Sequence, residues 1–500
     1  MKKKLIFFST VFAVLASTGI TSFAADAASV SDTFSMFFAL VRQCSPVIVV
    51  SVLSIVLIVL AIVFRKKISE FLNDSSASMM INSFIVFFSV FGLACFALAL
   101  ATDGGTWKNL LNGTDTPLDK YSHFSDYIKS LQYAGTKQFD MAADRLSPFG
   151  YLIFFLLAQF MPGSVFAADT ASKYAQLHKN QTLIMLYLIL VLFCIVLIYR
   201  MSRSKLRKNG ISLRNEVVAF LLVVSYPTMY CISMGNIAGF AVAACLFFLE
   251  FYNSEKKAFR ELAIIAIAVS AAIVPYTFVF AFLLLIDKSK MARLDFAQAA
   301  VFFSVLFVVP SIFTGFVNLL TYMKSLVVIP EYFVFGNGSI ANLLSVTGAP
   351  DVLLYIITVI TEVIALACVF ILPNAWQKSA AAVYFILNLI PSVNSLTMIF
   401  VFIPLVYLLS EKTHKAIDWL YLLAFALLVT PFPEWYYSCS DNFTLALEIL
   451  GFHNLRNANE LIAPVAVQMI FVLIVCQSIA VLKAKKKEAV AANAAEEKTA

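Results

Sequence analysis

The segment from residue 102 to residue 148 holds the side chains best suited to chemistry. Acids and aromatic rings are densest in the run Ser125-Asp126-Tyr127-Ile128-Lys129-Ser130-Leu131-Gln132-Tyr133. An acid beside aromatic rings at a membrane surface can act as a general base while the rings stack on a sugar. For any single acid, solvation of an exposed loop is the commoner role. Both interpretations stay open at this point.

A further acid, Glu362, lies in the middle of the apolar run 351–372. An ionisable side chain inside a membrane span is energetically costly and is usually functional. A transporter would use such an acid for proton coupling. The alternative is a protonated Glu that hydrogen-bonds to a neighbouring helix.

The sequence lacks the spacing of a metal site. The eight Cys stand singly without a CxxC pair, and His123 and His453 are isolated. We therefore assign no metal site and no cofactor, and we leave a requirement for a divalent metal open.

Membrane helices must position these side chains. The 500 residues are 61% hydrophobic and 13% charged, with 48 Phe, which is more apolar surface than a water-soluble protein can bury. A helix of about 20 apolar residues crosses a bilayer, so we predict an all-α, polytopic transmembrane bundle of roughly 11–13 membrane helices. The run 262–286 is broken by Pro275 and predicts a hairpin of two short helices. The clear spans are 46–64, 79–101, 181–199, 217–234, 238–252, 297–317, 351–372, 380–392, 396–410, 417–431 and 461–482.

The basic residues predict the orientation. Most of the 36 Lys and Arg form compact clusters on one side of the spans, as the positive-inside rule requires. We expect a multi-pass protein of the inner (plasma) membrane, with a disordered or frayed cytoplasmic tail at 483–500. The long loops 102–148, 321–350 and 432–460 then lie outside. Because the basic residues mark topology rather than a solvated face, membrane lipid is an expected partner and nucleic acid is not.

Two stretches leave the topology incomplete. The basic start Met1-Lys2-Lys3-Lys4, an apolar core and Ser22-Phe23-Ala24 predict a signal peptide at 1–24, cleaved after Ala24 or slightly later, although an uncleaved first span is the alternative. Both alternatives put 25–45 outside and leave 46–482 as the transmembrane domain. The stretch 149–166 either dips in and returns, or is followed by a further short crossing in 167–180.

Six stretches between residues 115 and 410 combine polar side chains with prolines and glycines near the ends of apolar runs. They are Ser125–Tyr133, Ser147–Phe154, Met234-Gly235-Asn236-Ile237, the Pro275 hairpin, Phe335–Ile340 with Leu343-Leu344, and Ile390-Pro391-Ser392 followed by Pro404-Leu405. In this order they resemble the motifs of GT-C superfamily glycosyltransferases, particularly glycosyltransferase family 87, which resembles polyprenyl-phosphate-sugar dependent membrane mannosyltransferases. The hairpin departs from that family because Ile273-Val274 stand where a basic residue is usual.

The resemblance implies a GT-C hexosyltransferase that acts at the extracytoplasmic face. It would transfer a sugar, with inversion, from a polyprenyl-phosphate-linked donor to a cell-envelope glycan or lipid acceptor. Such a donor needs no nucleotide-binding fingerprint, and the sequence has none. The implied general base is an outer-loop acid, in the order Asp126, Asp115, Asp119 and Asp103.

The same resemblance implies a set of substrate contacts. The candidates are Lys129, Tyr133, Arg145, Asn236, Asn337 and Ser339. For Asn236, Asn337 and Ser339 the alternative role is that of turn and helix-cap residues. Two other functions stay open: a lipid-linked glycan flippase or small-solute transporter, and a polysaccharide polymerase or ligase.

Overall fold

The computed structural model describes ten stretches of the chain, all within one of its two compact units. They are residues 75–101, 124–136, 147–160, 180–207, 212–286, 290–325, 338–345, 349–389, 397–429 and 462–499. The predicted signal peptide, the stretch 25–45, the span 46–64 and the loop 432–460 lie outside the described residues.

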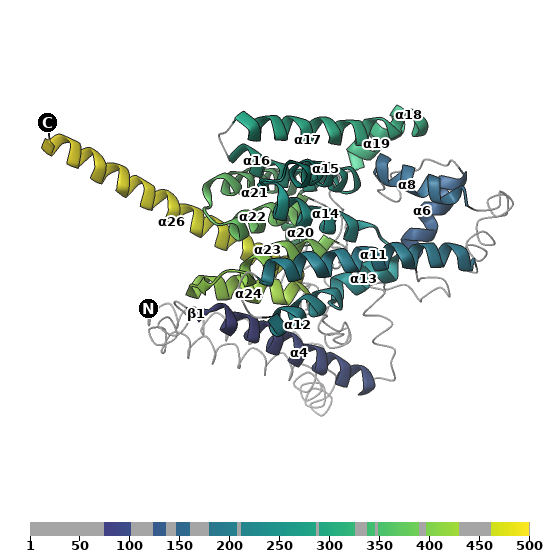
Figure 1. Ribbon diagram of the computed structural model, residues 1–500, viewed down its shortest axis with the longest axis horizontal. Coiled ribbons are helices and arrows are strands. Elements are labelled where there is room, and N and C mark those ends of the chain that lie inside the picture. Colours follow the sequence, from purple (N-terminus) through teal and green to yellow (C-terminus); the bar gives the residue numbers. More distant parts are fainter. Residues whose placement is uncertain are drawn as a thin grey trace, which may run out of the picture. The chain divides into compact units, whose positions relative to one another are not determined.

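The described chain is helical apart from one pair of two-residue strands (Figure 1), which confirms the predicted all-α fold. The strands β1 (Ser75–Ser76) and β2 (Thr413–His414) pair antiparallel, with Ser75 opposite His414. The helices, with 3₁₀ segments marked η, are α4 (Ala77–Ala101), α6 (Ser125–Thr136), α8 (Pro148–Ala158), α11 (Gln181–Leu206), α12 (Ser212–Val223), α13 (Tyr226–Met234), α14 (Ala238–Phe251), α15 (Lys257–Ile273), η2 (Pro275–Phe282), α16 (Leu283–Ile286), α17 (Lys290–Val308), α18 (Pro310–Thr314), α19 (Phe316–Ser325), α20 (Ile340–Ser345), α21 (Asp351–Ile371), α22 (Ala375–Leu389), η3 (Thr397–Val401), α23 (Phe402–Leu409), α24 (Ala416–Val429) and α26 (Ile462–Thr499).

Within the described residues, four helical stretches are long and apolar enough to cross a membrane: Gln181–Leu206, Met291–Phe313, Asp351–Ile371 and Ala463–Ala491. The pair α12 and α13 makes a fifth candidate, bent by 45°. Several other apolar helices, among them α8, α14 and α24, have only 10–17 residues. The helix α8, for example, has only 11 residues, about half a crossing.

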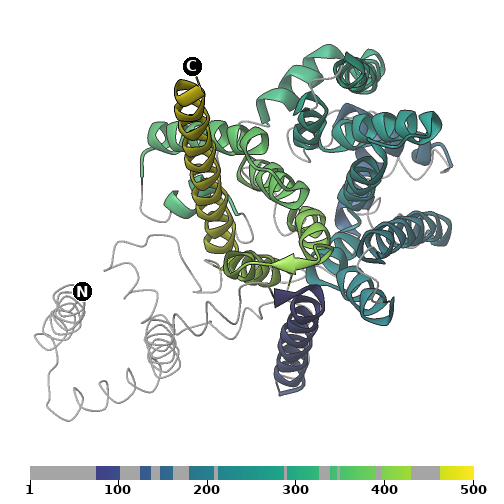
Figure 2. The same cartoon turned by 60° about the vertical axis from the view of Figure 1, so that its left-hand side comes forward.

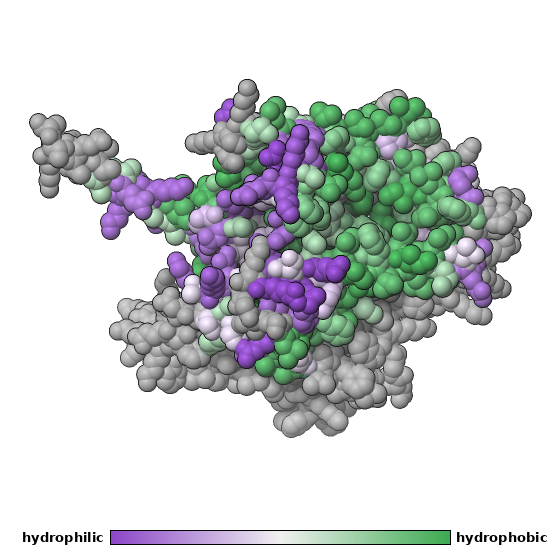
Figure 3. Space-filling view, viewed as in Figure 1, coloured by the Kyte–Doolittle hydropathy of each residue, from purple (hydrophilic) through white to green (hydrophobic). Residues whose placement is uncertain are grey.

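Apolar side chains on the surface show where lipid would lie. On α21 the exposed face carries Val352, Val359 and Val363, each more than half exposed. The opposite face of the same helix is buried against α22 and α26. Figure 3 shows hydrophobic side chains gathered over α11 and α17 as well. A surface of this kind is stable in a bilayer and not in water.

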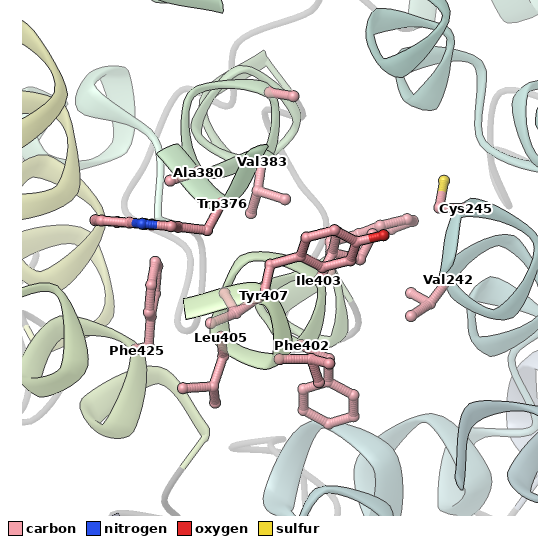
Figure 4. Packing of buried hydrophobic residues seen from close by; sticks show 14 of the residues in the cluster. Val242, Cys245, Trp376, Ala380, Val383, Phe402, Ile403, Leu405, Tyr407 and Phe425 are labelled. Carbon is pink, nitrogen blue, oxygen red and sulfur yellow. The ribbon is translucent and has the colours of Figure 1, made fainter. Parts of the chain in front are cut away.

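The interior is packed around α22 and α23. Trp376 is fully buried, and its ring meets Tyr421 edge-on at a centroid distance of 4.9 Å. Figure 4 shows Trp376 and Phe425 on one side of α23, with Tyr407 directed toward Val242 and Cys245 of α14. This core fixes the helices whose ends carry the predicted motifs.

Two predictions about breaks and ends have different outcomes. The break at Pro275 is confirmed: α15 ends at Ile273 and a 3₁₀ helix begins at the proline. The predicted frayed tail is wrong, because α26 continues as one helix to Thr499 (Figures 1 and 2). Alanine, lysine and glutamate are strong helix formers, and a helix already nucleated in the packed part propagates into them.

Candidate functional site

The candidate site is centred on Asp126, in the first turn of α6. An acid there is favoured by the unpaired N–H groups and the dipole of the helix start. Its carboxylate Oδ2 accepts a hydrogen bond of 3.0 Å from the side-chain amide of Asn236, which is 110 residues further along the chain. The contact brings together two residues that the sequence singled out separately.

Asn236 belongs to a turn that ends α13 and begins α14. Gly235 takes the left-handed conformation with φ of 79°, and the N–H groups of Gly235 and Asn236 donate to the carbonyls of Ile232 and Cys231. This pair of bonds is a Schellman motif, in which glycine is strongly preferred. The turn motif that the sequence predicted between two spans is therefore present.

The turn also fixes which way the Asn236 amide faces. Its Oδ1 accepts a hydrogen bond of 2.8 Å from the N–H of Ala238 at the start of α14. Since one end of the amide is committed to an N–H donor, the Nδ2 end must face Asp126. Asn236 thus bonds to the first residue of α14 and holds the acid at the same time.

Gly235 lets α6 approach this turn closely. A Cβ atom at Gly235 would lie 2.5 Å from the Tyr127 Cβ and 3.1 Å from the Phe124 Cα. No side chain fits at such distances, so the backbones of the two segments are in direct contact. The site residues are held by this contact as well as by the Asn236 amide.

The aromatic rings next to Asp126 support the site from inside. Tyr127 is 1% exposed, and its ring lies against that of Tyr187, with the centroids 4.7 Å apart and the planes tilted by 38°. Its hydroxyl donates a hydrogen bond to the Leu183 carbonyl. Burial raises the pKa of Tyr127, so it keeps that proton. The idea that the ring beside Asp126 stacks on a sugar does not fit Tyr127, whose faces are covered. Tyr133, at the other end of α6, is half-buried.

An apolar cavity of about 460 Å³ adjoins the Asp126–Asn236 pair. It lies among α8, α11, α14 and α15, and Tyr127 and Ile237, the chain neighbours of Asp126 and Asn236, line it. Its other lining residues are apolar throughout: Phe149, Ile153, Phe154, Leu157, Tyr187, Leu190, Leu197, Met201, Phe240, Ala243, Ala244, Phe247, Leu262, Ile265, Ala266, Val269 and Ile273. Such a space suits hydrocarbon and offers no polar contact to a sugar.

The motif at Ser147 builds one wall of this cavity. Ser147 is the N-cap of α8, and its Oγ accepts a hydrogen bond of 3.0 Å from the Gly150 N–H. Pro148 occupies the first helical position, where its missing N–H has no consequence. The predicted helix start is confirmed, and it directs Phe149 and Phe154 to the cavity.

The structure does not bring all the predicted site residues together. Lys129 is exposed on α6, one turn from Asp126. Ser339 is buried and caps α20, where its Oγ accepts from the Asn342 N–H; this is the helix-cap alternative. Five predicted site residues lie outside the described residues: Asp103, Asp115, Asp119, Arg145 and Asn337.

Glu362 lies apart from Asp126, in a buried polar group of its own. It is 5% exposed, and its Oε1 accepts a hydrogen bond from Asn388 on the neighbouring helix α22. Sequence reasoning singled out Glu362 but missed Asn388 and Gln468. Each of the two is a polar residue inside an apolar run. A polar residue in a membrane span is costly and often functional, as an acid is, so this pattern could have identified both.

The described part of the chain holds no cluster of metal-ligand residues. Its His, Cys, Asp and Glu residues do not gather in any group of three or more that could hold a metal ion.

Comparison with known proteins gives one match. The model of glycosyltransferase family 87 matches residues 147–431, from the N-cap of α8 to just beyond α24. Asn236 and the cavity helices fall within this stretch, whereas α6 and Asp126 precede it. No curated protein and no solved structure matches the chain.

Proposed function

The chain belongs to glycosyltransferase family 87, and on this premise we propose that it transfers a hexosyl group from a polyprenyl-phosphate-linked donor to a cell-envelope glycan or lipid acceptor. The observation that carries the proposal is the position of Asp126. Asn236 holds this acid, and the residues that follow Asp126 and Asn236 in the chain line an apolar cavity. A lipid-linked sugar needs both features within reach of each other.

The reaction proposed is an inverting displacement. Asp126 accepts the proton of the acceptor hydroxyl while that oxygen attacks the anomeric carbon. The bond from the anomeric carbon to the phosphate oxygen breaks, and polyprenyl phosphate leaves with the electron pair. One glycosidic bond replaces one glycosyl phosphate bond, and the proton ends on the Asp126 carboxylate. Lys129, exposed one turn away on α6, is the proposed partner for the departing phosphate.

The cavity suits the lipid tail of the donor. A tail that moves from the bilayer into this cavity leaves one hydrocarbon environment for another, so its attraction to the cavity comes from close packing against apolar side chains. Four helices supply these side chains. The half-buried Ala244 on α14 and Ala266 on α15 leave the space open between bulkier neighbours. A tail held there would leave its phosphate near the Asp126 end of the cavity.

The helix α11 supports an extracytoplasmic position for Asp126. Tyr127 bonds to Leu183 at the start of this helix, whereas Arg203 and Lys205 occupy its last turn. Its 26 residues correspond to about 39 Å, enough to cross the bilayer. If the basic end is cytoplasmic, as the positive-inside rule favours, the acid lies at the outer face.

The donor class can be tested with membranes from cells that do or do not express the protein. The membranes receive a radiolabelled hexose linked either to undecaprenyl phosphate or to a nucleotide. We expect protein-dependent transfer of label from the lipid-linked sugar and not from the nucleotide sugar. The transfer should occur in sealed vesicles that expose the extracytoplasmic face of the membrane to the added substrates. Transfer from the nucleotide sugar, or movement of the lipid across the membrane without a new glycoside, would contradict the proposal.

A further inference from the structure

A network of polar side chains from three helices converges on the short non-helical stretch before α20. The carbonyl oxygen of Gly338 accepts a hydrogen bond of 3.2 Å from Nε2 of Gln468 on α26. The N–H of Ile340 donates to Asn388 Oδ1 of α22 at 2.8 Å. These bonds matter because non-helical backbone at membrane depth is stable only where other protein groups satisfy it.

The Asn388 amide is in turn held by α21. Its Nδ2 donates to Thr361 Oγ1 at 3.1 Å and also to Glu362 Oε1. Asn388 is 1% exposed, so water does not compete for these groups. With both acceptors on α21, the amide can present only its carbonyl to Ile340.

Gln468 is fixed in the same manner. Its Oε1 accepts the hydroxyl proton of Tyr384, which leaves its Nε2 to donate to Gly338. A Cβ at Gly338 would lie 2.5 Å from Val467 Cγ2, so the backbone of the stretch rests directly on α26. The stretch is therefore held from α22 and α26, and through Asn388 from α21.

We propose that Glu362 and Asn388 are positioning residues that hold the stretch 338–345 at the membrane face on which Asp126 lies. Glu362 acts through Asn388 and does not touch substrate. This location of the stretch 338–345 rests on the proposed function and on the direction of α26. Gln468 lies in the second turn of that helix, and the lysines after residue 482 lie at its far end. The same orientation argument that puts Asp126 outside puts this stretch on the same side.

The role requires a hydrogen-bond acceptor at Glu362 rather than a charge. Glu362 Oε2 is buried without a hydrogen-bond partner, so one carboxyl oxygen does all of the bonding. A carboxamide presents the same carbonyl acceptor in nearly the same shape. Glu362→Gln should therefore preserve the arrangement, whereas Glu362→Leu should release Asn388 and, through it, the Ile340 N–H.

Hydrogen–deuterium exchange of the full-length protein in nanodiscs measures this release without any substrate. We expect the peptide covering 338–345 to exchange about tenfold faster in Glu362→Leu and Asn388→Leu, the change expected for one typical buried hydrogen bond. Glu362→Gln should match the unmodified protein. Thr358→Val is the matched control, because Thr358 is buried on the same helix and its hydroxyl bonds to the Leu354 carbonyl one turn earlier, outside the network.

Three outcomes would overturn the proposal: unchanged exchange in Glu362→Leu, equal acceleration in Glu362→Gln, or equal acceleration in Thr358→Val. If Glu362→Leu does not fold, Gln468→Leu tests the same stretch through the bond to Gly338, and it should also accelerate exchange. Sugar transfer is measured in parallel, with about a tenfold loss expected for Glu362→Leu and none for Glu362→Gln. Because exchange needs no donor, a failure of positioning remains distinguishable from a failure of the proposed function.

Discussion

Asn236 Nδ2 lies 3.0 Å from Asp126 Oδ2, and this hydrogen bond joins the first turn of α6 to the turn between α13 and α14. The amide is oriented by Ala238, and the turn is packed against α6 through Gly235. The acid is therefore held by groups within the stretch that the family model matches, although α6 itself precedes that stretch.

Replacing Asn236 tests whether this bond positions the acid. Asn236→Ala should lower kcat by about ten- to a hundredfold, the effect of losing a hydrogen bond to a charged group, with little change in KM. Steady-state transfer kinetics provide the measurement. Asn215→Ala is the control, because it removes one buried amide bond, to the Leu206 carbonyl, at the opposite end of α11. Equal losses in both variants would mean that the Asn236 effect is general destabilisation.

Gly235 tests the close contact between α6 and the turn. Gly235→Ala forces a side chain into the left-handed region, at about 1–2 kcal/mol, and into the Tyr127 side chain and backbone. We expect faster hydrogen–deuterium exchange in the peptide 125–136 and a lower melting temperature. Gly239→Ala is the comparison, because that glycine lies within α14 and its nearest obstacle is the Cys194 Sγ. Equal exchange of the peptide 125–136 in Gly235→Ala and Gly239→Ala would show that the close contact at Gly235 does not hold α6.

The sequence was most informative where one residue determines local backbone. Gly235, Ser147 with Pro148, and Pro275 each specify a turn, a helix start or a break from local chemistry alone, and each prediction is confirmed. Asp126 and Asn236 could be named, but not their contact, because 110 residues separate them. Pairing across such a distance is decided by helix packing, which local patterns do not encode.

The buried polar groups were the least predictable part. Tyr127 looks like an exposed loop aromatic in the sequence, and only the packing of α6 against Phe154 of α8 and Tyr187 of α11 buries its ring. Asn388 stands in an apolar run with no acid nearby in sequence, and its partner Glu362 lies 26 residues before it. The sequence did not predict the helical tail after Lys483. Its charged side chains favour a solvated end, whereas its Ala, Lys and Glu residues also favour a helix.

Tyr127 provides a prediction about its own hydroxyl. Tyr127→Phe removes the bond to the Leu183 carbonyl and should lower stability by about 1 kcal/mol, measured by thermal unfolding in detergent. The ring contacts with Tyr187 and Phe154 stay. Because burial raises the pKa of Tyr127, this hydroxyl does not ionise between pH 5 and pH 9. The pH profile of transfer should therefore be unchanged, and a displaced profile would show that the hydroxyl moves protons in the reaction.

Filling the cavity tests the site of the lipid tail. Ala244→Leu combined with Ala266→Leu narrows the space between α14 and α15. Excluding part of the tail from its packing contacts in the cavity should raise the donor KM severalfold, with kcat little changed. Ala297→Leu adds the same side chain on the exposed face of α17, away from the cavity, and should have no effect. An unchanged donor KM in the double variant would exclude the cavity as the tail site.

The central claim is that Asp126 removes the acceptor proton. The most direct test is the single-turnover rate of sugar transfer by Asp126→Asn, compared with Asp351→Asn, which changes an exposed acid in the first turn of α21. Both variants keep the shape of the side chain, so both should insert and fold. We expect Asp126→Asn to lose a factor of about 10²–10⁴ in rate and Asp351→Asn to keep the full rate. Full transfer by Asp126→Asn would contradict the account.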